Sequence, residues 1–138
     1  MNRGINKETL ENPDIKGKNT KANPIRVDVM VTHHMEAAVT EISEAMKIEK
    51  AATVRMLIWF AMRFASPVEL TGMTNERSFD TDTQSTQRLD TRITQDMLDE
   101  IEYLMKIEKV KKSRVIKRYI EWSLANIHKY TIADFLER

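Results

Sequence analysis

Two short segments of the chain alternate between apolar and polar residues. Segment 26–32 reads RVDVMVT and segment 88–94 reads RLDTRIT. Successive side chains of a strand point to opposite faces, so this period predicts two half-buried β-strands. The inner faces of the two strands are predicted to consist of Val27, Val29, Val31, Leu89, Thr91 and Ile93.

Helical patterns follow each strand. Thr32 and Thr94 occupy N-cap positions, where a hydroxyl can accept a hydrogen bond from a first-turn N–H group. Apolar residues at helical spacing then predict a first helix in each segment. Its apolar stripe is formed by Met35, Val39, Ile42 and Met46, or by Met97, Ile101, Leu104 and Met105. A second helix is predicted from Val54, Leu57, Ile58, Ala61 and Ala65, and from Val115, Ile116, Tyr119, Ile120 and Leu124.

The chain therefore contains an internal repeat of strand, helix and helix. A second anchor, MKIEK at 46–50 and at 105–109, lies three residues closer to the strand in the second copy. This spacing predicts an extra helical turn or a longer loop in the first copy. Because a short strand needs a partner, the expected fold is mostly α, with a two-stranded antiparallel ribbon and the order β-α-α-β-α-α.

The remaining segments divide the chain into five parts. Residues 1–24 are polar and aperiodic, and residues 67–86 are rich in Ser, Thr, Asp and Asn. Such compositions predict a flexible N-terminal arm and a linker. The repeat units are expected at 25–66 and 87–128, and a short C-terminal tail at 129–138.

Composition narrows the class of protein. The chain has no cysteine, and its longest apolar run, Met56–Met62, is far shorter than the roughly 20 residues that span a bilayer. We therefore expect a soluble, cytoplasmic protein without a membrane partner. The formal net charge of +1 gives no support for nucleic-acid binding, but residues 106–118 are densely basic, so local fields would have to attract an anionic partner.

The doubled strand-helix-helix pattern resembles the ribbon-helix-helix superfamily of the Arc and MetJ type. The two strands and the SRVIK segment at 113–117 carry the resemblance, while AATV at 51–54 departs from the family's polar turn. The two-unit layout is similar to that of the conjugation accessory protein TraY. The resemblance implies sequence-specific binding of double-stranded DNA by a β-ribbon in the major groove.

Outward-facing strand residues would then read the bases. The candidates are Arg26, Asp28, Met30, Arg88, Asp90 and Arg92. An arginine can form two hydrogen bonds with guanine, an aspartate can accept one from a cytosine amino group or hold an arginine, and a methionine can contact a thymine methyl group. Because Met30 replaces an arginine at its matched position, we expect an asymmetric DNA site.

The start of the second helix is the candidate phosphate contact, because free N–H groups and the helix dipole favour an anion there. The second copy offers Lys109, Lys111, Lys112 and Ser113 in this region. The first copy offers only Lys50 and Thr53, so the phosphate contacts are expected to be stronger in the second copy.

The apolar run at 56–62 covers most of its helix, which favours a position in the core. The alternative is an oligomer contact, anchored by Trp59, Phe60 and Phe64, that would support self-association along DNA.

No pattern in the chain predicts an enzyme. His33, His34 and His128 do not form a metal set, the three glycines make no phosphate loop, and we expect no cofactor or small-molecule substrate. Transcriptional regulation is the first expectation for function. A plasmid relaxosome or partition accessory protein is one alternative. A helical protein-interaction module, such as an antitoxin, is an alternative of another class.

Overall fold

The computed structural model describes residues 23–66, 68–70 and 86–129. Most of the predicted arm, linker and tail lies outside these residues. The elements are β1 (Ile25–Val31), α2 (His33–Met46), α3 (Lys50–Phe64), β2 (Gln87–Ile93), α5 (Gln95–Glu108), α6 (Lys112–Asn126) and the 3-10 helix η2 (Ile127–Lys129). The prediction of a mostly helical fold with a two-stranded antiparallel sheet is confirmed.

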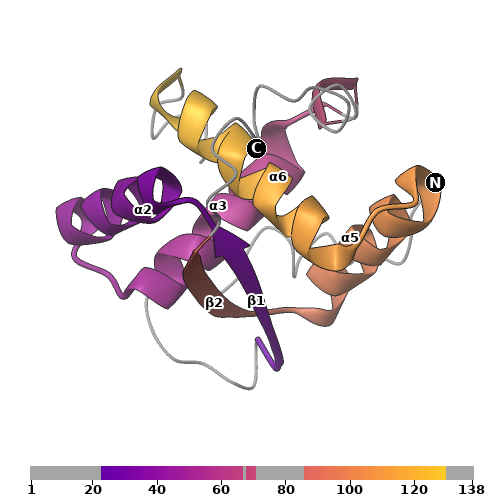
Figure 1. The fold of residues 1–138 in the computed structure, drawn as a ribbon, viewed down its shortest axis with the longest axis horizontal. Helices are drawn as coiled ribbons and strands as arrows, with labels where there is room; N and C mark the ends of the chain where they lie inside the picture. Colours follow the sequence, from indigo (N-terminus) through magenta and orange to yellow (C-terminus); the bar gives the residue numbers. More distant parts are fainter. Residues whose placement is uncertain (1–22, 67, 71–85, 130–138) are drawn as a thin grey trace.

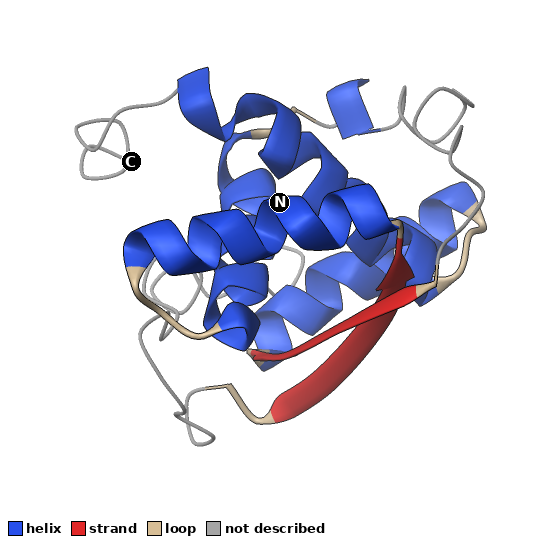
Figure 2. Ribbon diagram, turned by 60° about the vertical axis from the view of Figure 1, so that its left-hand side comes forward, coloured by secondary structure: helices blue, strands red, loops and turns tan. Residues whose placement is uncertain are grey.

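The two strands form the sheet by pairing with each other. β1 and β2 run antiparallel, with Ile25 opposite Ile93 and Val31 opposite Gln87. Both strands alternate between buried and exposed residues from their second residue onward, as predicted. The described helices lie on the buried side of the sheet, and none of them covers its other side (Figure 2). The sheet therefore has one inner and one outer face.

The first helix of each half begins and ends in the same way. The hydroxyl oxygens of Thr32 and Thr94 accept hydrogen bonds from the backbone N–H groups of Met35 and Met97, both at 3.1 Å, which confirms the predicted N-caps. At the other end, Lys47 and Lys109 adopt the left-handed conformation, with φ of 58° and 57°. Glycine is the residue that most often adopts this conformation at the end of a helix, but here each helix ends with a lysine.

The repeat has a constant offset, so the prediction of an extra helical turn or a longer loop in the first half is wrong. Each element of the second half starts 62 residues after its counterpart, at 87 against 25, 95 against 33 and 112 against 50. α2 and α5 both have 14 residues. The MKIEK motif at 46–50 bridges α2 and α3, whereas at 105–109 it ends α5, so the two copies of the motif occupy non-equivalent places.

The two halves share one hydrophobic core rather than having one each. α3 and α6 cross behind the sheet (Figure 1), and the ring centroids of Phe60 and Trp122 are 5.6 Å apart. α3 also packs against the strand of the other half, because the Thr91 hydroxyl of β2 donates to the Ala51 carbonyl at 2.5 Å. Met46 was predicted in the apolar stripe but is 45% exposed, since it is the last residue of α2.

Part of the predicted linker packs on this core. Residues 68–70 are helical, and Leu70 is buried. The Glu69 carboxylate accepts hydrogen bonds from the Ser66 backbone N–H at 2.9 Å and from the Trp122 indole at 3.3 Å. These bonds, the one from Ser66 foremost, lower the pKa of Glu69. The start of the connection between the halves is therefore tied to α6.

Candidate nucleic-acid interface

The outer face of the sheet carries the six residues that were predicted to read bases. All six are exposed: Arg26, Asp28, Met30, Arg88, Asp90 and Arg92. Three arginines and two aspartates give this outer face an excess of one positive charge. The sheet therefore presents a row of long polar side chains to the outside and apolar ones to the core.

The strand register arranges these six residues in three cross-strand pairs. Arg26 lies opposite Arg92, Asp28 opposite Asp90, and Met30 opposite Arg88. Like charges directly opposite each other destabilise a sheet. They are relieved in part by a diagonal ion pair between Arg26 Nη2 and Asp90 Oδ2 at 3.3 Å, and by a hydrogen bond from Arg92 Nη1 to the Pro24 carbonyl at 3.1 Å. The remaining repulsion between like charges destabilises the sheet.

The start of α6 is strongly basic. Lys111 is its N-cap and makes no side-chain capping bond, and Lys112, Ser113 and Arg114 are exposed in its first turn. The positive end of the helix dipole adds to these charges. Arg114 was not among the predicted phosphate contacts, although it belongs to the SRVIK segment that carries the family resemblance.

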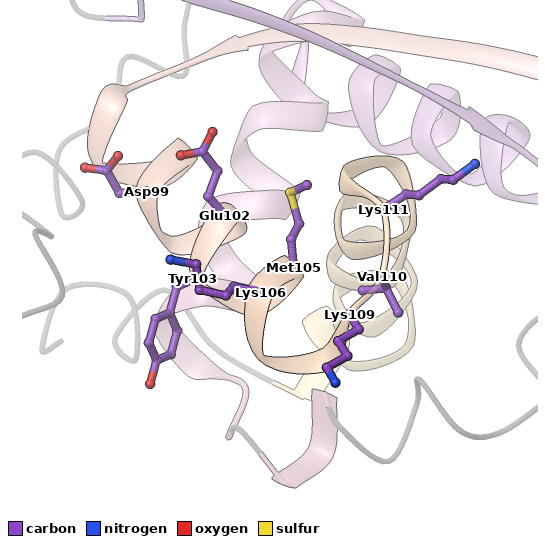
Figure 3. Close-up of a pocket in the computed structure, with 8 residues that line it drawn as sticks. All are labelled: Asp99, Glu102, Tyr103, Met105, Lys106, Lys109, Val110 and Lys111. Atoms are coloured by element: carbon purple, nitrogen blue, oxygen red, sulfur yellow. The ribbon is translucent and has the colours of Figure 1, made fainter.

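Lys109 is set apart from this group. It is exposed and is the left-handed residue at the C-cap of α5. In Figure 3, Lys111 extends toward the side on which the strands run, whereas Lys109 extends to the opposite side. Of these two lysines, Lys111 is therefore the better placed to share one surface with the sheet.

The start of α3 is chemically different from the start of α6. Its N-cap is Glu49, and the Lys50 ammonium group forms an ion pair with the Glu36 carboxylate at 2.5 Å. Hydrogen bonds from Lys50 and then Thr40 lower the pKa of Glu36. The prediction that Thr53 contacts phosphate is wrong, because its side chain is fully buried and its hydroxyl donates to the Glu49 carbonyl at 3.0 Å.

The aromatic residues of α3 belong to the core. Phe60 is fully buried and Trp59 is 8% exposed, so they cannot anchor the oligomer contact that was the alternative for them. Phe64 is half-buried, with its ring centroid 4.8 Å from that of Phe60. The physical reason is that α2, β2 and α6 all pack against α3.

A shallow groove lies along α5 and the turn that precedes α6. Its lining residues are Asp99, Glu102, Tyr103, Met105, Lys106, Lys109, Val110 and Lys111. Their side chains diverge rather than converging on one point (Figure 3). Within the described residues, no group of three or more His, Cys, Asp or Glu side chains is arranged to hold a metal ion.

Comparisons with models of protein families, with curated proteins and with solved structures found no match to this chain. Among the helices of the described residues, none is both long and apolar enough to cross a membrane.

Proposed function

We propose that this protein binds double-stranded DNA sequence-specifically, by placing the outer face of its sheet in the major groove, as a tandem ribbon-helix-helix protein. The outer face itself carries the proposal. Three arginines are exposed there on a sheet whose opposite face is core, and two of the three cross-strand pairs place like charges opposite each other. A partner that supplies hydrogen-bond acceptors would bind these arginines, and the repulsion between them in the free protein would then favour binding.

The dimensions of the sheet support this proposal. The major groove is about 12 Å wide and admits a two-stranded ribbon, whose strands lie about 4.8 Å apart. Seven residues in each strand are paired, so the exposed side chains form two parallel rows along one face of the sheet. The guanidinium groups of Arg26, Arg88 and Arg92 can each donate two hydrogen bonds to the O6 and N7 acceptors of a guanine.

The start of α6 would fix the protein on the DNA backbone. Free N–H groups at a helix N-terminus, together with Lys111 and Lys112, form a set of donors for a phosphate oxygen. Such contacts position a protein without reading sequence. The corresponding end of α3 has Glu49 in place of Lys111, so the phosphate contacts are proposed to be stronger in the second half.

Transcriptional regulation is the role that we propose for this binding. A relaxosome or partition accessory protein would use the same surface on other DNA. Footprints of the protein on the DNA that encodes it separate these roles, since a regulator protects promoters and an accessory protein protects transfer or partition sites.

The first experiment is a selection from a random duplex library at fixed, near-physiological salt. The native chain is compared with a variant carrying Arg88→Ala and Arg92→Ala, and with a control carrying Lys106→Ala and Lys129→Ala. The control removes two charges from exposed residues outside the sheet. Salt is held constant because phosphate contacts alone give apparent affinity.

We expect the native chain and the control to enrich one motif, and the arginine variant to lose its guanine positions. Enrichment of no motif by the native chain would overturn the proposal. In that case the alternative of a protein-interaction module becomes the one to test.

A further inference from the structure

The middle pair of the outer face lies on the axis that exchanges the two halves. Asp28 and Asp90 are 62 residues apart, which is the constant offset between the halves, and they are also directly opposite each other in the register. Two residues that occupy equivalent positions in the two halves and also face each other in the sheet lie on either side of a pseudo-twofold axis. The axis therefore passes through a pair of exposed carboxylates at the centre of the sheet.

These two carboxylates have different surroundings. Asp90 accepts a hydrogen bond from Arg26 across the sheet. Within the described residues, no side chain donates to Asp28. The pair thus keeps open acceptor positions at the centre of a surface whose ends carry arginines. Two like charges at this distance repel each other, and both repel a phosphate backbone, so a base that approaches them must supply a hydrogen-bond donor.

The spacing of the pair is close enough for contact with two neighbouring base pairs. Directly opposite residues of an antiparallel sheet have Cα atoms about 4.5–5.5 Å apart, and bases along one DNA strand are stacked about 3.4 Å apart. A twofold-related pair of carboxylates can therefore reach two adjacent base pairs, one from each half of the site. In the major groove, cytosine offers its amino group as a donor without an acceptor of its own beside it.

We propose that Asp28 and Asp90 specify the centre of the DNA site, as a G·C step with one cytosine on each strand. The inference rests on the proposed function and adds the identity of the central bases. Thymine O4 in that place would bring an acceptor against a carboxylate, and adenine would bring its N7 beside the amino group. The pair therefore weakens binding to other sequences and also strengthens binding to the correct one.

The arginine next to the pair completes the assignment. Arg26 is held by Asp90 through one of its five N–H donors, which leaves the others for a guanine. An arginine held in this way loses less freedom on binding than a free one. The guanine that Arg26 reads is therefore expected beside the central step.

The test compares three chains in the same library selection. The first is native, the second carries Asp28→Asn and Asp90→Asn, and the third carries Glu41→Gln and Glu44→Gln as a control. The control removes two negative charges from exposed residues of α2. Binding to purified duplexes that differ only at the central step then gives the ratio of affinities, and thermal unfolding of each chain without DNA verifies its fold.

We expect the native chain and the control to prefer a central step with a cytosine on each strand, by about fivefold or more over other steps. The Asp28→Asn, Asp90→Asn variant should keep the flanking guanines, lose the central preference and bind random duplexes more tightly. Its thermal midpoint should be unchanged or higher, because the repulsion is removed.

The results separate the inference from the proposed function. A native motif with any other central step, or a central preference that survives both Asn substitutions, overturns the inference while DNA binding stands. A native chain that enriches no motif overturns the proposed function and the inference with it.

Discussion

The two halves of this molecule have the same backbone plan and different chemistry. Their strands have seven residues each, their first helices 14 and their second helices 15, at a constant offset of 62. The positions that define the elements carry similar residues, as with the capping threonines Thr32 and Thr94 and the left-handed lysines Lys47 and Lys109. Some exposed positions are also the same, as with Arg26 and Arg88 or Asp28 and Asp90, but others have diverged in charge, as with Met30 and Arg92.

This difference separates what folds the chain from what the chain does. The inner face and the caps must satisfy one shared core, so the two halves retain matching patterns there. The exposed positions face no such requirement. Glu49 against Lys111, and Met30 against Arg92, are therefore the differences through which we propose that the halves contact DNA differently. Changing a residue to its counterpart in the other half is the direct way to test this comparison.

The largest effect is expected at a buried ion pair that only the second half has. Arg118 Nη1 lies 2.7 Å from Glu108 Oε1, and their side chains are 4% and 8% exposed. The counterparts in the first half are Met56 and Met46. Arg118→Met leaves a buried carboxylate without this partner and should lower the free energy of unfolding by about 3–5 kcal/mol in urea titrations.

The double variant Glu108→Met, Arg118→Met gives the second half the residues of the first. Replacing both partners by apolar side chains is often neutral or stabilising, so most of the loss should be recovered. A double variant that is as unstable as the single one would show that the two halves do not tolerate the same residues at these positions.

The next effect concerns the asymmetry of the outer face. Met30→Arg makes the first half match the second, where Arg92 stands at the counterpart position. We expect tighter binding to a duplex with two identical half-sites, by about 1–3 kcal/mol, because a bidentate arginine–guanine contact is added. Met46→Arg adds the same charge outside the sheet. Equal gains for both variants would mean that only charge matters.

A smaller effect is expected at the starts of the second helices. Lys112→Ala should reduce the slope of log affinity against log salt by about 0.9, the value for one phosphate contact. Lys50→Ala should leave the slope nearly unchanged, because Lys50 is already paired with Glu36. If the two substitutions change the slope equally, the predicted difference between the halves at the phosphate contacts is wrong.

The sequence predicted those parts of the fold that depend on local pattern. The strands, the capping threonines and the helix order follow from alternation, helical spacing and hydroxyl placement, and the structure confirms them. The register between the two repeats was predicted wrongly because the MKIEK motif was used to align them, although its two copies lie at non-equivalent places. The helix ends that settle the register are left-handed lysines, and lysine carries no such signal in a sequence.

The candidate site was only partly accessible from the sequence. Strand alternation correctly placed the six exposed residues on one face. Their register could not be predicted, because it depends on which residues of two distant strands pair, and so the central position of Asp28 and Asp90 was missed. Thr53 was assigned to the surface because its polarity gave no indication that α3 would be covered on several sides.

The smallest effect is the pH dependence of the Glu36–Lys50 pair, which the second half lacks because Leu98 is the counterpart of Glu36. Hydrogen bonds from Lys50 and Thr40 lower the pKa of Glu36 below the ordinary value of a glutamate. A carboxylate with a lowered pKa in the folded state stabilises the fold above its unfolded pKa, and this contribution is lost as the pH falls through the folded pKa. We therefore expect Glu36→Gln to be less stable than the native chain at pH 7 by about 0.2–1 kcal/mol, a small value because the pair is partly exposed to solvent. The difference should vanish near pH 3 in urea titrations of both chains.

Lys50→Met provides the matched control, since it removes the main cause of the lowered pKa and should show the same loss at pH 7. A difference between Glu36→Gln and the native chain that persists unchanged at low pH would mean that the contribution of Glu36 does not depend on its charge.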